Sequence, residues 1–94
     1  MAIYIPIRCI RREGEDAYYE YSQPIRAPHP TKAKRTVQVG ENVGVVRLNL
    51  ETRSVSRVSG QEWDDGFYFS RVQAKLLKHL RNEGKVPEVT CYAA

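Results

Sequence analysis

Apolar and polar residues alternate along residues 3–12, which read IYIPIRCIRR. This period of two predicts a β-strand with one buried face, because successive side chains of a strand point to opposite faces of its sheet. Pro6 has no N–H to donate to a ladder, so we predict that this strand is bulged or, preferably, lies at an edge of the sheet. Its inward residues are Ile3, Ile5, Ile7 and Cys9.

Turn residues and then aromatic residues follow this first strand. Residues 13–16 (EGED) have turn chemistry, and the tyrosine-rich residues 17–23 have a high β propensity. The two segments therefore predict a hairpin with the first strand. Tyr19 and Tyr21 fall on one face of its second strand because they are two residues apart.

Several β segments are separated by turn residues in the middle of the chain. Residues 36–39 predict a short strand, and Gly40 and Gly44 predict a turn after it. The runs 45–50 and 53–58 predict a second hairpin, closed by a Glu-Thr pair that suits a tight type I′ turn poorly. A wider loop with a shifted register therefore stays open as an alternative. A two-residue loop would pair Leu48 with Val55 and Val45 with Val58.

Helical spacing replaces strand spacing at residues 69–80, where apolar residues recur every three or four positions. Asp64 and Asp65 stand where a helix cap and favourable negative charge belong, and Gly84 can end the helix in a left-handed conformation. Residues 88–92 alternate again and predict a final strand. The apolar stripe of the helix consists of Phe69, Val72, Leu76 and Leu80.

These elements predict an α+β fold, an antiparallel sheet of five to six short strands with one C-terminal amphipathic helix packed on one face. In chain order they are two strands, a loop, three strands, the helix and a last strand. A chain of 94 residues can hold one core but not two, so we expect a single domain over residues 1–94. Its 41% of hydrophobic and 28% of charged residues are typical of a folded globular chain.

The apolar residues are too dispersed for a membrane protein. No stretch approaches the roughly 18 apolar residues of a membrane span, and the start of the chain lacks a signal-peptide core, so we predict a cytoplasmic protein without membrane association. Cys9 and Cys91 are too few for a disulfide scaffold and fall in strand-like runs, so we predict that both are reduced. No cofactor motif occurs, and we predict no cofactor.

The first candidate for a binding site is the segment 24–35, which contains three prolines and no acidic residue. It has no apolar periodicity, so we predict an exposed loop. Loops of this length are uncommon in compact domains and often carry function. The net charge of the chain is +4, and this segment concentrates positive charge. Its candidate partner-binding residues are Arg26, His29, Lys32, Lys34 and Arg35.

The favoured functional hypothesis is a small non-enzymatic binding module whose partner is a protein or a second copy of the chain. The basic loop would act together with the sheet face that the helix leaves open, and an edge strand could accept a partner strand. Tyrosine and arginine are among the residues that dominate the energetics of protein interfaces. The candidates on the open face are Tyr19, Tyr21, Arg47 and Arg57.

Binding of single-stranded nucleic acid is the alternative hypothesis. The basic loop, the tyrosines and a cationic stripe on the outer side of the helix would supply positive charge and stacking surfaces. No motif of a known nucleic-acid-binding module accompanies them, so charge and aromatic content are the only support. The stripe consists of Arg71, Lys75 and Lys78.

A small enzyme, with a site assembled only by folding, is the second alternative. Cys91 with His79 could act as nucleophile and base, and Asp64 with Asp65 as acid and base, but a core thiol and a helix cap are simpler interpretations. Structural zinc sites use closely spaced pairs of ligands, whereas the possible ligands here are isolated, so we predict neither a catalytic residue nor a metal site. These possible ligands are Cys9, His29, His79 and Cys91.

Overall fold

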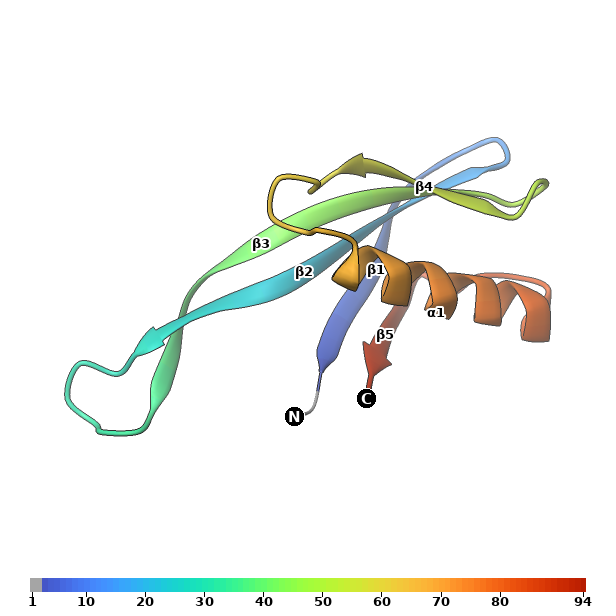
Figure 1. Cartoon of the computed structure of the whole chain (residues 1–94). Helices are drawn as coiled ribbons and strands as arrows, with labels where there is room; N and C mark the ends of the chain where they lie inside the picture. The colour runs from blue at the N-terminus through green and yellow to red at the C-terminus, as the bar shows by residue number, and fades with distance from the viewer. Residues whose placement is uncertain (1–2) are drawn as a thin grey trace.

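One antiparallel sheet and one helix make up residues 3–94, the part of the chain that this computed structural model describes (Figure 1). The elements are β1 (Tyr4–Glu13), β2 (Asp16–Pro28), β3 (Thr36–Asn49), β4 (Ser54–Ser59), α1 (Phe67–Glu83) and β5 (Val89–Ala93). The strand order in the sheet is β4-β3-β2-β1-β5. Because α1 lies across one face of the sheet, the predicted α+β fold with a helix near the C-terminus is confirmed.

The core lies between α1 and the sheet face that it covers. Val72, Leu76 and Leu80 of the predicted helical stripe are buried, and Phe69 packs against them while staying partly exposed. The central strands contribute alternate residues, as a period of two requires. Removing these apolar side chains from water is the main favourable term in folding. The buried sheet residues are Ile5, Ile7, Ala17, Tyr19, Tyr21, Val46 and Leu48.

The helix ends where the sequence predicts. Gly84 has a φ of 71°, in the left-handed region, and its N–H donates to the Leu80 carbonyl at 2.9 Å. Glycine carries no Cβ to strain this conformation, so it stops the helix at low cost. No helix within residues 3–94 is both long enough and apolar enough to cross a membrane.

β1 is an inner strand, so the prediction that it lies at an edge is wrong. It pairs with β2 on one side and with β5 on the other. Ile3 and Ala94 exchange two backbone hydrogen bonds of 3.0 Å, and the alternation of an antiparallel ladder then turns the nitrogen of Pro6 away from β5. On the other side, pairing with β2 begins only at Ile7, so the missing N–H of Pro6 interrupts no ladder.

β2 and β3 form one long hairpin, which corrects two predictions. β3 runs through Gly40 and Gly44 without a break, so the predicted turn between its two halves does not form. Residues 24–28 belong to β2, so the loop predicted over residues 24–35 is confined to residues 29–35.

The prolines of this hairpin occupy positions that a strand tolerates. The N–H of His29 donates to the Arg35 carbonyl at 2.8 Å, so His29 points its backbone toward β3. Backbone groups along a strand point alternately to one side and the other. Pro28 and Pro24, one and five residues before His29, therefore point their nitrogens away from β3. Proline is accepted in a strand where its nitrogen faces an unpaired edge. The sequence pattern alone could not distinguish these positions from a loop.

β3 and β4 form the predicted second hairpin, but with the wider of the two loops considered. Leu48 pairs with Val55 as predicted, whereas Val45 pairs with Ser59 and not with Val58. A β-bulge beside Val45 causes this shift, because it sets one extra residue of β4 against β3. The register prediction is therefore right near the loop and wrong beyond the bulge.

Candidate interaction surface

β2 and β3 extend beyond the rest of the sheet as a two-stranded ribbon, which we call the arm and define as residues 22–43 (Figure 1). β1 pairs with β2 only as far as Tyr21, and β4 pairs with β3 only from Val45 onward. The two strands of the arm therefore pair only with each other among the described residues. The arm gives the molecule its elongated shape, with extents of 51 × 25 × 21 Å. We call residues 29–35 the tip.

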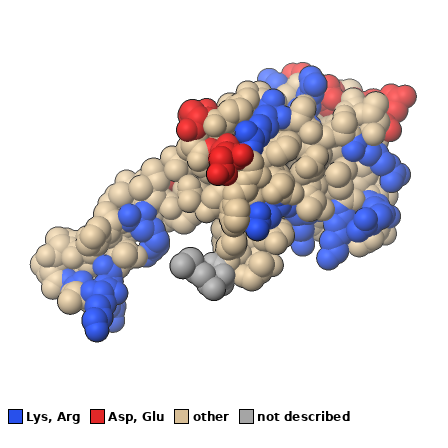
Figure 2. All heavy atoms as spheres, viewed as in Figure 1, with Lys and Arg blue, Asp and Glu red and all other residues tan. Residues whose placement is uncertain are grey.

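The far end of the arm is positively charged. Figure 2 shows Lys and Arg side chains gathered there, apart from those of the main body. Glu41 is the single acidic residue of the arm, and it lies toward the main body. Arg26 is held in place because its Nε and Nη2 donate to the Thr36 Oγ1 and carbonyl oxygens at 2.7 and 3.0 Å. The arm cations are Arg26, Lys32, Lys34 and Arg35.

His29 shapes the tip. Its Nδ1 accepts hydrogen bonds from the backbone N–H groups of Thr31 and Lys32, at 3.1 and 2.9 Å. Lys34 has a φ of 62°, which turns the chain back toward β3. His29 therefore uses its Nδ1 to hold the turn, and the neighbouring lysines extend from that turn into solvent.

The arm also exposes aliphatic side chains and an unpaired strand edge. Ile25 is 41% exposed, Val39 62% and Val43 37%. The edge of β3 that faces away from β2 has no partner strand over residues 36–42 within the described chain. The edge closes at Val43, because its carbonyl accepts a hydrogen bond from Trp63 Nε1 at 2.9 Å.

The four candidates predicted on the open sheet face do not share one surface. Tyr19 and Tyr21 are 0% and 1% exposed because α1 covers their side of β2, so the prediction that they are exposed on the open face is wrong. Arg57 lies on the same covered side, with its guanidinium 4.8 Å from the centre of the Phe69 ring. Arg47 is exposed on the open face, as predicted.

Tyr21 belongs to a buried polar cluster at the start of α1. Its hydroxyl donates to Asp64 Oδ2 at 2.7 Å. The Asp64 carboxylate also accepts the N–H groups of Gly66, Tyr68 and Phe69 at 3.0, 3.1 and 2.8 Å. Burial alone would raise the pKa of Asp64, but these four hydrogen bonds outweigh it and hold the pKa below its ordinary range. The cluster is thus a buried helix cap that holds an ionised carboxylate.

Replacement of Tyr19 by phenylalanine is expected to reduce the loss of stability in alkali. The Tyr19 hydroxyl donates to the Pro87 carbonyl, and burial raises the pKa of Tyr19 to about 12. Because the folded pKa exceeds the unfolded value of about 10, stability is complete below pH 10 and is lost as the pH rises toward 12. Urea unfolding from pH 8 to pH 12 measures this slope, with a loss of about 1 kcal/mol expected at neutral pH from the missing hydrogen bond.

The same alkaline slope in Tyr19→Phe and in the unchanged chain would contradict this assignment. Burial also raises the pKa of Tyr21, followed in importance by its hydrogen bond to Asp64, so part of the slope should persist in the variant.

The open face of the sheet is shallow, and its charges are largely paired. Arg8 lies 3.1 Å from Glu20, and Arg11 lies 3.2 Å from Glu13. A cavity of about 340 Å³ lies beside the first of these pairs, open to solvent. This face therefore offers a partner less uncompensated charge than the arm does.

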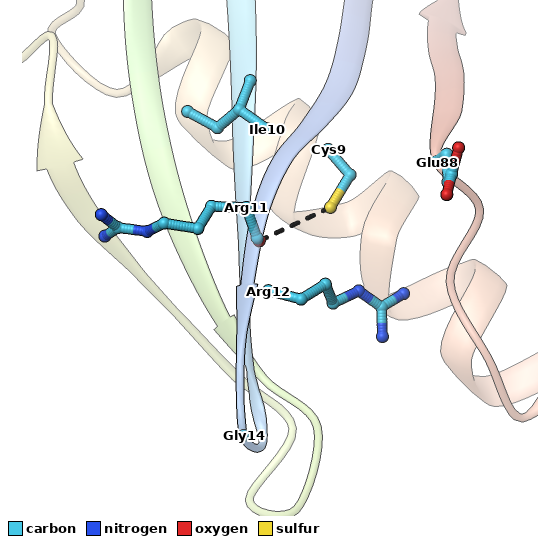
Figure 3. A pocket seen from close by; sticks show the side chains of 6 residues that line it. All are labelled: Cys9, Ile10, Arg11, Arg12, Gly14 and Glu88. Carbon is cyan, nitrogen blue, oxygen red and sulfur yellow. Dashed lines mark hydrogen bonds between the residues drawn. The ribbon is translucent and has the colours of Figure 1, made fainter.

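A larger hollow of about 570 Å³ lies at the end of β1, past the point where β5 stops pairing (Figure 3). The Cys9 thiol there faces the carbonyl of Arg11, at 3.6 Å. The side chains of Arg11 and Arg12 extend in different directions, and Arg12 donates to the Val86 carbonyl at 3.5 Å. No general base among the lining residues contacts the thiol, so the hollow lacks a nucleophile paired with a base.

His79 links the helix to β5 and does not meet Cys91. Its Nδ1 faces the Glu83 carboxylate, and its Nε2 lies 2.9 Å from the Thr90 hydroxyl. Because Cys91 is the next residue of the strand after Thr90, its side chain points to the opposite face of the sheet. The hypothetical nucleophile and base are therefore on different faces. Over residues 3–94, no three His, Cys, Asp or Glu side chains come together in a way that could hold a metal ion.

The cations of α1 are separate from those of the arm. Arg71 stacks 3.6 Å from the centre of the Phe67 ring and donates to the Phe67 carbonyl at 2.9 Å. Lys75 and Lys78 flank a small hollow of about 160 Å³ beside Tyr92 of β5. In Figure 2, acidic side chains lie over the segment that precedes α1, near the base of the arm. On this face the helix stripe and the arm do not form one continuous cationic track.

Comparison of the chain with protein-family models, with curated proteins and with solved structures gave no match. The functional assignment therefore depends on the geometry and charge of the arm.

Proposed function

We propose that this chain is a non-enzymatic protein-interaction module and that its partner binds the arm. One observation carries the proposal: the arm is a two-stranded ribbon that exposes aliphatic side chains and the unpaired edge of β3. A two-stranded ribbon is marginally stable in water, and a third strand or a packed surface adds the missing support. A partner at this edge would supply that support and bury the aliphatic groups.

The two edges of the arm differ in their capacity to accept a strand. The β2 edge carries Pro24 and Pro28, whose nitrogens face outward and cannot donate. The β3 edge over residues 36–42 contains no proline, so its outward-facing N–H and C=O groups are available for strand addition, apart from the Thr36 carbonyl that Arg26 occupies. Main-chain hydrogen bonds give affinity in this mode of recognition, and neighbouring side chains give specificity. We therefore place the partner along β3.

Nucleic acid is the second candidate partner, because the tip concentrates Lys32, Lys34 and Arg35 and a two-stranded ribbon fits the major groove of a duplex. Two observations make this candidate weaker. The arm contains no Phe, Tyr or Trp on which a base could stack, and its exposed apolar groups are aliphatic. The helix stripe that the sequence pattern grouped with the tip lies on another part of the molecule.

Photo-crosslinking in cells tests the choice of partner. A photoreactive residue at Val39, on the exposed part of β3, is expected to give covalent protein adducts that nuclease treatment leaves intact. The same residue at Thr52, exposed in the loop between β3 and β4, is the matched control and should give none of these adducts. Adducts at position 39 that disappear with nuclease would point to nucleic acid, and an absence of adducts would overturn the proposal.

A further inference from the structure

We infer that the partner of the arm is a second copy of this chain, paired antiparallel with the first along the β3 edge of residues 37–42. This inference rests on the proposed function, because it names the occupant of the same edge. Both copies use the same residues, so the contact closes after two chains and does not propagate. The support comes from the backbone of the edge and from the placement of charge along the arm.

The backbone alternation along the edge fits a two-fold pairing. Val43 turns its carbonyl outward to Trp63, and Glu41, two residues earlier, points the same way. Regular alternation would make Val39 the next residue whose backbone groups face outward. Val39 is instead an extra residue without a partner in the ladder with β2, so the next outward-facing residue is Gln38. Gln38 of each copy can therefore exchange backbone hydrogen bonds with Glu41 of the other. The two-fold axis then passes beside Val39, whose side chain is 62% exposed in the single chain.

Unpaired charges of opposite sign lie at the two ends of the arm. Cations are concentrated at the tip, and acidic side chains lie at the base, where the segment between β4 and α1 meets β3 (Figure 2). None of these side chains takes part in an ion pair within the described part of one chain. The tip cations are Lys32, Lys34 and Arg35, and the base acids are Glu41, Glu62 and Asp65.

The inferred register brings the tip of one copy to the base of the other. If Gln38 faces Glu41, then Val37 faces Asn42 in the last pair before the edge closes at Val43. Arg35, two residues before Val37, then lies beyond this pair and near Gly44 of the other copy. Gly44 lies against the segment that carries the base acids, because a Cβ on Gly60 would be only 2.7 Å from its Cα. A parallel arrangement of the arms would instead gather the tip cations of both copies, so charge selects the antiparallel one.

Sedimentation equilibrium of the full chain tests this inference. We expect a dimer at low salt, with a dissociation constant that rises about tenfold or more by ~0.5 M salt, because solvent-exposed ion pairs are screened. Reversal of two base acids (Glu62→Lys with Asp65→Lys) should weaken dimerisation about tenfold or more, as should reversal of two tip cations (Lys34→Glu with Arg35→Glu). The chain with all four changes should recover the dimer, because the ion pairs form again with their signs exchanged.

Two further variants separate the strand pairing from charge alone. Gln38→Pro removes an outward N–H without breaking the ladder with β2, so it should leave a folded monomer. Arg81→Glu with Lys85→Glu reverses exposed charges at the far end of α1 and should leave the dimer unchanged. Thermal unfolding of each variant confirms that the main body stays folded.

A chain that is monomeric at low salt up to ~100 µM would overturn the inference, since that corresponds to a very weak contact. A dimer that Gln38→Pro leaves intact would overturn it as well. The photo-crosslinking experiment distinguishes this failure from failure of the proposed function. If position 39 forms adducts with a different protein, the proposed function stands and only the second copy as the partner is ruled out. If it forms adducts with nucleic acid alone, or none at all, both proposals are ruled out.

Discussion

Replacement of Asp64 by alanine is expected to lower the free energy of unfolding by about 3–5 kcal/mol, because it leaves buried hydrogen-bond donors and a nearby cation without their partner. Asp64 is 1% exposed and accepts four hydrogen bonds, one from the Tyr21 hydroxyl and three from backbone N–H groups at the start of α1. Arg57 Nη2 lies 3.9 Å from its Oδ2. Urea unfolding of the variant measures the loss.

Asp65→Ala is the matched control. Asp65 is exposed, and its carboxylate accepts a single N–H, that of Phe67, at 3.2 Å. Its removal should cost about 0.5–1 kcal/mol, the ordinary value for a helix cap. Similar losses for the two aspartates would show that Asp64 acts only as a local cap and that the buried cluster adds nothing to it.

The same carboxylate is expected to make the protein sensitive to acid. The folded-state pKa of Asp64 lies below the unfolded value of about 3.9, so its contribution is complete above that value and is lost as the pH falls through the folded pKa. Urea unfolding from pH 6 down to pH 2 should therefore show a steeper loss for the unchanged chain than for Asp64→Asn, which carries no titrating group at this position. If the unchanged chain and Asp64→Asn lost stability in parallel as the pH falls, the acid sensitivity would come from groups other than Asp64.

The sequence pattern predicts the covered side of this fold well, because burial imposes a period that the pattern reveals. The stripe of residues 69–80 packs against the sheet, and Gly84 ends the helix. The period of two correctly places Tyr19 and Tyr21 on one face, but it does not say which face the helix covers. The prediction that these tyrosines lie on the open face is wrong for that reason, since the choice of covered face depends on contacts between distant segments.

The arm is the part of the molecule that the pattern could not predict. Pro24 and Pro28 are typical of a loop, and only the hydrogen-bond alternation of the folded hairpin shows that their nitrogens face an unpaired edge. The basic residues of this segment are visible from charge alone, because charge composition does not depend on whether the segment is a loop or a ribbon; their role as a site stays a prediction. The sequence pattern likewise predicts a turn at Gly40 and Gly44, although both lie inside β3.

Gly44 is expected to be the more sensitive of these two glycines by a wide margin. A Cβ at position 44 would lie 2.6 Å from Cζ of Tyr21, whose hydroxyl is tied to Asp64, so the ring cannot move aside without breaking a buried hydrogen bond. Gly44→Ala should therefore lower the free energy of unfolding by about 1–3 kcal/mol, the usual cost of overpacking a core. In a chain that already carries Tyr21→Leu, Gly44→Ala should cost less stability than it does in the unchanged chain, because the ring that the new methyl group meets is gone.

Gly40→Ala is the matched control, because it makes the same chemical change in the same strand. A Cβ there would lie 3.8 Å from Cδ1 of Ile25, an ordinary contact, and alanine is preferred to glycine in a strand interior by roughly 0.5–1 kcal/mol. The two substitutions should thus change urea stability in opposite directions. Equal effects at both positions would mean that the ring of Tyr21 is free to shift, and the close approach of β3 to the helix cap would then not be what requires glycine at position 44.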